Sequence, residues 1–275
     1  MVLAVSTFAC LDATAKFLSA HYPIPLIVWV RYAFQGALML VFLGPRLGAS
    51  LVKTSNLRLQ IVRGLVLTAA SLVFLTALSR MPMAEAASIA FMAPLIIAVL
   101  AGPLLHERVD ARTWLALAGG FAGVLLIIRP GGGVFTWAAL LPLGSALLMA
   151  LYQMLTRKLA GRDTALTTLF YPALVGTFVV PLIFPLDFTL PQQPLHAVMF
   201  CALGVLGGIG HFLLIRAYDH APASVLAPFT YAQLLVAIAL GWLVFGQLPD
   251  ALALAGMLMI AVSGLVLVLG HRRGA

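Results

Sequence analysis

Charged side chains are scarce in this chain of 275 residues. Asp, Glu, Lys and Arg together make up 9% of the sequence and only 8 residues are acidic, whereas 63% are hydrophobic. The mean hydropathy is +1.11. Soluble domains carry about 25% charged residues. The composition therefore excludes a soluble protein and predicts an integral membrane protein.

Cysteine is also scarce, and the common catalytic motifs are missing. Cys10 and Cys201 both lie within predicted spans, which predicts that they behave as small apolar residues and form no disulfide. The sequence contains no G-x-x-x-x-G-K-[ST] phosphate loop and no G-x-S-x-G nucleophile motif. His106-Glu107 is not followed by a second His at the spacing of a zinc-binding H-E-x-x-H. We therefore expect no enzyme, no direct coupling to ATP, and no metal or other cofactor.

Long apolar runs take up most of the sequence. A helix that crosses a bilayer needs about 20 apolar residues, and the chain divides into ten such segments with short connections. Runs such as Leu95–Leu100 do not alternate between apolar and polar residues, as strands of a membrane barrel do. The predicted fold class is an all-α integral membrane protein. Its ten predicted helices span residues 2–19, 25–43, 59–79, 84–105, 113–128, 137–157, 165–185, 197–217, 223–245 and 251–270.

The sequence repeats itself about 140 residues apart. Gly64 corresponds to Gly204, and Leu115–Gly119 returns unchanged as Leu252–Gly256. Because each unit holds five spans, the second unit enters the membrane upside down relative to the first. Inverted repeats of this kind are typical of secondary transporters with a binding site near the bilayer midplane. We predict a first repeat at residues 1–129, a glycine-rich linker at 130–136 and a second repeat at 137–275.

The net charge of +8 marks topology and not a nucleic-acid partner. The basic residues are scattered between apolar spans instead of forming one patch. Positively charged loops stay in the cytoplasm, and only Arg80 and Arg129 fall outside when both termini are placed inside. This distribution predicts a multi-pass membrane protein with both termini cytoplasmic. The predicted cytoplasmic cations are Arg46, Lys53, Arg58, Arg63, Arg108, Arg112, Arg157, Lys158, Arg162, Arg216, Arg272 and Arg273.

Asp12 and Lys16 are the most unusual residues of the first span. Their spacing of four places both on one helix face, with Asp12 near the midplane and Lys16 one turn outward. An ionisable side chain at that depth costs about 2.5–3.5 kcal/mol on insertion scales, so it needs a hydrated cavity or a partner. A zwitterionic ligand would place its ammonium near Asp12 and its carboxylate near Lys16. Proton exchange at Asp12 and a structural ion pair are the alternatives.

Further candidate site residues occupy matched positions of the two repeats. Tyr152 is the counterpart of Asp12, and His211 is the counterpart of Ser71. We predict a midplane cavity in which the aromatic side chains offer stacking surface and the polar ones orient the ligand; packing is the alternative for each. Arg31, early in the second span, is expected to reach the outer interface. The remaining candidates are Phe91, Tyr231 and Gln233 in the cavity, and Pro94 and Pro228 as helix-bending positions.

Span four and its continuation resemble a known family. Met83–Pro94, Leu105–Arg108 and the glycine-rich Gly119–Ile127 are similar to the EamA domain of the drug/metabolite transporter superfamily. The resemblance covers the chain as two tandem copies. It implies ten helices, with a central cavity formed chiefly by helices 1, 3, 4, 6, 8 and 9. The ten-helix form is most similar to bacterial inner-membrane amino-acid exporters of the YddG type.

The sequence thus predicts a secondary transporter that exports amino acids by alternating access. Its expected partners are a small-molecule substrate and the lipid bilayer, with no nucleic acid, and it is expected to function as a monomer. The alternatives are an importer of another metabolite, such as a vitamin or a nucleotide-like compound, and a membrane scaffold or receptor that transports nothing.

Overall fold

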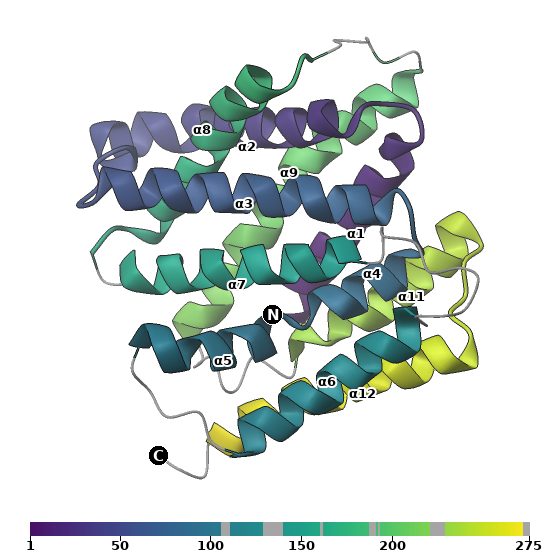
Figure 1. Ribbon diagram of the computed structural model, residues 1–275. Helices are drawn as coiled ribbons and strands as arrows, with labels where there is room; N and C mark the ends of the chain where they lie inside the picture. The colour runs from purple at the N-terminus through teal and green to yellow at the C-terminus, as the bar shows by residue number, and fades with distance from the viewer. Residues whose placement is uncertain are drawn as a thin grey trace.

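The structure, a computed structural model, describes residues 1–105, 111–128, 140–159, 162–186, 191, 193–220 and 229–271. Within these ranges the chain is helical and contains no strand (Figure 1). The helices are α1 (Val2–Ser19), α2 (Ile24–Leu47), the 3₁₀ turn η1 (Gly48–Leu51), α3 (Leu57–Leu78), α4 (Met83–Ala90), α5 (Ala93–Leu105), α6 (Ala111–Ile128), α7 (Leu141–Leu159), α8 (Ala165–Ile183), α9 (Pro194–His220), α11 (Ala232–Phe245) and α12 (Ala251–His271).

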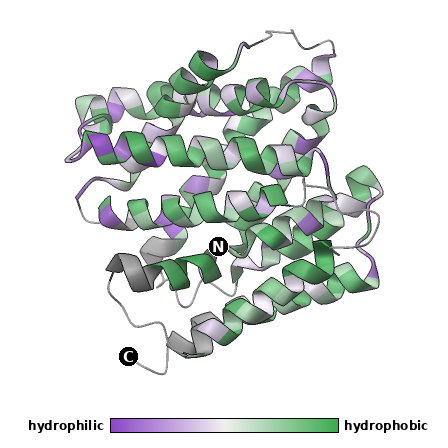
Figure 2. Ribbon diagram, in the orientation of Figure 1, coloured by the Kyte–Doolittle hydropathy of each residue, from purple (hydrophilic) through white to green (hydrophobic). Residues whose placement is uncertain are grey.

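The helices confirm the predicted membrane fold. Five helical segments are long and apolar enough to cross a membrane by length and composition, and five shorter apolar helices account for the other predicted spans. Hydrophobic residues run along most of the helix lengths, whereas hydrophilic ones lie mainly at helix ends and connections (Figure 2). The predicted linker 130–136 and Pro228 lie outside the described residues.

Short polar signals fix where the helices begin. The Asn56 side chain accepts a hydrogen bond from the backbone N–H of Leu59 at the start of α3, and Thr164 does the same for Thr167 at the start of α8. Asp250 accepts from the N–H of Ala253 at the start of α12. Each contact satisfies one of the backbone donors that a helix N-terminus leaves without an intrahelical partner.

Span four, which the sequence analysis treats as one helix with Pro94 as a helix-bending position, is broken just before that proline. α4 ends at Ala90 and α5 begins at Ala93, so Phe91 and Met92 form a turn inside the predicted span 84–105. Pro94 lies in the first turn of α5, where its missing N–H costs no intrahelical bond. A break of this kind exposes backbone groups within the bundle instead of to lipid.

Contacts between distant segments divide the bundle into two ends. At the Lys16 end, which we define by the α1–α2 connection, Tyr22 bonds His196 of α9 and Lys16 reaches the segment after α3. At the Asp163 end, defined by the α7–α8 connection, Asp163 bonds Thr54 and Ser55 of the α2–α3 connection. Successive spans therefore alternate in direction, as α2 and α3 do in Figure 1.

The largest helix contacts join one repeat to the other. α6 packs on α12, α3 on α7, α1 on α9 and α2 on α8. Exchanging each helix for its counterpart in the other repeat reproduces the same set, because the α1–α9 contact becomes α7–α3 and the α2–α9 contact becomes α8–α3. The contact pattern confirms two inverted five-helix repeats that interlock, with α6 and α12 along one edge of the bundle (Figure 1).

Glycine permits the close approach of α6 and α12. A Cβ atom at Gly123 would lie 2.6 Å from the carbonyl oxygen of Gly256, and one at Gly256 would lie 2.5 Å from that of Gly123. The obstructing atoms are backbone, which cannot rotate away. Gly204 and Gly208 of α9 behave differently, because Gly204 packs on Phe34, whereas a Cβ atom at Gly208 would have no neighbouring atom within 4 Å.

We expect Gly123→Ala to destabilise the α6–α12 pair, because overpacking of a close contact costs about 1–3 kcal/mol. Thermal unfolding of the purified protein in detergent measures the effect. Gly208→Ala is the matched control, since a methyl group there meets open space. Equal melting temperatures for the two variants would contradict the close backbone contact.

Candidate functional site

Asp12 connects the two repeats in the middle of the bundle. The amide Nε2 of Gln233, in the second residue of α11, lies 3.4 Å from Asp12 Oδ2, halfway along α1. Arg31 of α2 interacts electrostatically with the same carboxylate. The structure therefore brings together two of the predicted site residues, Asp12 and Gln233, and adds Arg31 beside them.

Phe91 and Tyr231 stack on each other. Their ring centroids are 5.3 Å apart with an interplanar angle of 29°. The two residues are 140 positions apart in the sequence, each at the point where a half-helix of its repeat begins or ends. Offset stacking of this kind stabilises an aromatic pair by about 0.5–1.5 kcal/mol beyond the area it buries. The predicted matched aromatics thus meet face to face across the two repeats.

The other polar candidates have separate partners. Tyr32 and Ser71 join α2 to α3 through hydroxyl groups 2.8 Å apart. His211 packs edge-on against Phe8 with ring centroids 4.9 Å apart, and the charges of Arg31 and Arg63 both act on it. Ser71 and His211 therefore lie among polar side chains of α2 and α3 but do not contact each other.

Lys16 differs from its predicted role, because its ammonium group is already bound to protein. The Nζ atom donates to the carbonyl oxygens of Leu78 and Met81, both at 2.6 Å, and lies 5.3 Å from the centroid of the Phe245 ring. Only 8% of the side chain is exposed. Lys16 fastens α1 to the end of α3 and to α11. Within the described residues it forms no ion pair with Asp12, and the charge that acts on it is that of Glu85.

Arg63 is a buried residue that the sequence analysis assigned to the cytoplasmic surface. Its side chain is 1% exposed. It donates to the Tyr152 hydroxyl at 3.1 Å, the Thr156 hydroxyl at 3.2 Å and Gln60 Oε1 at 3.1 Å, and it also donates to the carbonyl oxygen of Thr168. All four acceptors are neutral. Tyr152 is therefore a partner of Arg63 and not of Asp12.

Gln60 links Arg63 to Asp163 through its side-chain amide. While Gln60 Oε1 accepts from Arg63, its Nε2 donates to Asp163 Oδ2 at 2.8 Å. Asp163 also accepts from the Thr54 hydroxyl and the Ser55 backbone N–H. We call Arg63, Gln60 and Asp163 the Asp163-end network. It ties α3 to α7 and α8 at one end of the bundle.

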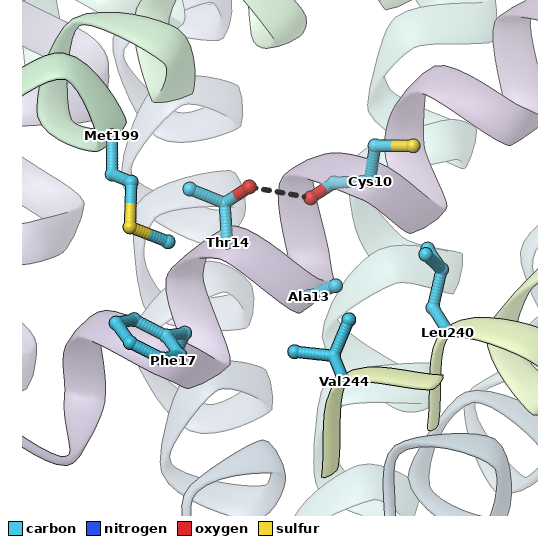
Figure 3. A pocket seen from close by; sticks show the side chains of 7 residues that line it. All are labelled: Cys10, Ala13, Thr14, Phe17, Met199, Leu240 and Val244. Carbon is cyan, nitrogen blue, oxygen red and sulfur yellow. Dashed lines mark hydrogen bonds between the residues drawn. The ribbon is translucent and has the colours of Figure 1, made fainter. Parts of the chain in front are cut away.

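A pocket beside α1 is lined by residues of α1, α9 and α11 (Figure 3). Positions 10 and 14 lie two residues from Asp12, on the opposite face of the helix. The Thr14 hydroxyl bonds the carbonyl oxygen of Cys10 within α1. The lining is otherwise apolar, so this pocket offers no charged group to a substrate. It is lined by Cys10, Ala13, Thr14, Phe17, Met199, Leu240 and Val244.

Comparison with known proteins identifies the family. The sequence profile of the EamA-like transporter family matches residues 1–129 and 136–270. The chain belongs to this family. Curated relatives of this EamA protein include a riboflavin transporter of Vibrio cholerae, 27% identical over 96% of this chain and 89% of the relative. The pseudopaline exporter CntI of Pseudomonas aeruginosa is 29% identical over 97% and 93%. An S-adenosylmethionine uptake transporter of Rickettsia bellii is 25% identical over 95% and 89%.

A solved structure shares the fold of this EamA protein. A crystal structure with 21% sequence identity aligns with a TM-score of 0.67 over 99% of this chain and 95% of the other. The family and its named relatives make the chain a multi-pass membrane transporter of small molecules.

Arg63 was missed for a simple reason. A basic residue near the start of a predicted span looks like a flanking charge, and Arg63 is only seven residues into α3. The available signal was Gln60, which lies three residues earlier, one turn away on the same helix face. Two polar side chains on one face of an apolar helix predict a buried contact.

We expect Arg63→Met to destabilise the protein, because each buried acceptor left without a donor costs about 1–3 kcal/mol. Chemical denaturation in detergent micelles measures the loss. Arg58→Met is the matched control on the same helix, where the side chain is exposed. If both variants lose the same stability, the buried network contributes nothing.

The Asp163 carboxyl predicts a pH dependence at its end of the bundle. Burial acts to raise its pKa, but hydrogen bonds from Thr54, Ser55 and Gln60 prevail and lower the pKa from 3.8 to about 2. Because the pKa is lower in the folded protein, the ionised carboxylate stabilises the fold when the pH is above the pKa of the unfolded chain. This stabilisation is lost as the pH falls through the pKa of the folded protein. Asp163→Asn should therefore melt below the wild type at pH 7, and the gap should close between about pH 4 and pH 2. A gap that stays constant over this range would exclude the charged network.

Proposed function

We propose that this EamA protein is a secondary active transporter that exports amino acids across the bacterial inner membrane. The observation that carries the proposal is the Asp12–Gln233 contact, which joins the two repeats at the centre of α1. A carboxylate at this depth is costly unless it serves a ligand or a proton. In the proposed complex the substrate ammonium binds Asp12 and is oriented by Gln233.

The stacked Phe91–Tyr231 pair supports an amino acid with an apolar or aromatic side chain. Tyr231 lies two residues before Gln233, which contacts Asp12, and α11 packs on both α1 and α4. Phe91 follows α4 and stacks on Tyr231. Planar apolar groups bind well against aromatic rings. In this proposal Phe91 and Tyr231 receive the side chain, while Ser71 and His211 border the route through the bundle.

The interlocked repeats support alternating access. Lys16 ties helices together at one end and the Asp163-end network does so at the other. We propose that rocking of repeat 1–129 against repeat 137–275 opens one end while the other stays closed, about the linker at 130–136 and the positions of Pro94 and Pro228. A monomer holds the complete site.

The proposed orientation places the Asp163 end in the cytoplasm. Among the described residues, Arg46, Lys53, Arg58, Lys158 and Arg162 lie at or near this end, whereas Arg80 lies at the other. Positive residues are retained on the cytoplasmic side. Both termini are then cytoplasmic, and the predicted export runs from the Asp163 end to the Lys16 end.

Import of another metabolite is the second candidate, and the relatives favour it. Two of the compared proteins are named for riboflavin transport and for uptake of S-adenosylmethionine, whereas CntI is named an exporter. S-adenosylmethionine itself contains an α-amino-acid group, so an Asp12 site suits it too. The two candidate functions differ in the direction of transport and in the size of the substrate.

We expect Asp12→Asn to lower amino-acid counterflow in proteoliposomes about tenfold or more, because a charge-assisted hydrogen bond contributes about 1.5–3 kcal/mol. Asp250→Asn is the matched control, because asparagine still caps α12. Amino acids, riboflavin and S-adenosylmethionine are compared in the wild type. Amino-acid flux that survives Asp12→Asn, or flux of riboflavin alone, would refute the proposal. If the wild-type protein transports none of these compounds, a scaffold or receptor is favoured.

A further inference from the structure

Three basic side chains lie inside the bundle, and their hydrogen bonds differ. Lys16 donates to two carbonyl oxygens, and Arg63 donates to four acceptors. Arg31 makes no hydrogen bond to any residue that the structure describes, and its Nε atom, like that of Arg63, is buried without a partner. Its neighbours are the Tyr32 ring, 5.5 Å from the guanidinium carbon, and the charge of Asp12.

Gln35 lies one turn further along α2 than Arg31. The side chain is 3% exposed and forms no hydrogen bond within the described ranges. Positions 31 and 35 lie on one helix face. Both side chains point toward Gly207 of α9, where a Cβ atom would lie 3.2 Å from Gln35 Oε1 and 3.8 Å from Arg31 Nε. Glycine therefore keeps a methyl group away from these two side chains.

Buried polar groups are normally hydrogen-bonded, and each exception calls for an explanation. A guanidinium and an amide on one face offer several N–H donors, and arginine binds carboxylates through two parallel hydrogen bonds. Asp12 and Arg31 act on each other electrostatically, but no ion pair links them in the described part of the chain. A ligand that carries both charges would bridge this separation.

We propose that Arg31, aided by Gln35, is the carboxylate anchor of the transport site, so that Asp12 and Arg31 together select zwitterionic substrates. The inference rests on the proposed amino-acid transport and replaces Lys16, whose ammonium is bound to backbone, in the role predicted from sequence. An α-amino acid places its ammonium on Asp12 and its carboxylate on Arg31. A primary amide or a decarboxylated amine of the same side chain leaves Arg31 without its partner and is a poor substrate.

The test compares each amino acid with its primary amide in proteoliposome counterflow. Wild-type protein should prefer the acid, and Arg31→Gln should lose about tenfold or more of acid flux while amide flux changes little, which removes the preference. Arg46→Gln is the matched control, since it removes an exposed cation from the end of the same helix. A melting curve of each variant verifies its fold.

A second pair of variants tests the space beside Arg31 and Gln35 without changing any charge. Gly207→Ala presses on Gln35 and Arg31 and should lower acid flux, whereas Gly208→Ala, one residue on, meets no atom within 4 Å and should not. This pair keeps the test valid if Arg31→Gln does not fold. An unchanged preference for the acid in Arg31→Gln, or equal effects of the two glycine variants, would overturn the assignment.

The outcomes for the two proposals are distinct. Amino-acid flux that depends on Asp12 but not on Arg31 overturns the carboxylate anchor alone. If wild-type vesicles transport riboflavin, which has no carboxylate, but transport no amino acid, both proposals are overturned. Wild-type transport of acids and amides at equal rates keeps the transporter and rejects the zwitterion selection.

Discussion

The cost of placing charge inside a bilayer governs how this bundle is built. A charged or polar group at that depth must find a partner within the protein, since lipid offers none. Lys16 finds two carbonyl oxygens, and Arg63 finds a set of neutral acceptors that Gln60 links to Asp163. These contacts join helices that are far apart in the sequence. The polar residues thus fasten the bundle at its two ends, and the centre is left to Asp12 and Arg31.

The inverted repeats determine which helices meet. Because the largest contacts run between repeats, neither repeat buries its apolar faces alone. The symmetry is also kept in detail, as in the Phe91–Tyr231 stack at positions 140 apart. It is broken where charge is involved, because Asp12 corresponds to the neutral Tyr152, whose hydroxyl accepts a hydrogen bond from Arg63. A symmetric scaffold with an asymmetric polar interior gives a transporter two similar halves and one oriented site.

Much of the architecture was predictable. The first predicted span, 2–19, coincides with α1, and the predicted edges of α3 and α8 lie within two residues of the observed ones. A bend at Pro94 was predicted, but not a complete break at Phe91–Met92. A run of small apolar residues is compatible with a continuous helix until neighbouring helices supply partners for its freed backbone groups. The partners of Lys16 were equally hidden, since carbonyl oxygens carry no sequence signature.

The sequence by itself determined the membrane location, the number of spans and the inverted repeat, because apolar length and residue spacing are local properties of the chain. It also marked Asp12 as an exceptional charge. Only the tertiary structure decided which buried cations have hydrogen-bond partners in the protein and which has none among the described residues. Partners such as Leu78 and Met81 for Lys16, or Tyr152 for Arg63, lie more than 60 residues away, and their positions depend on how the two repeats pack together.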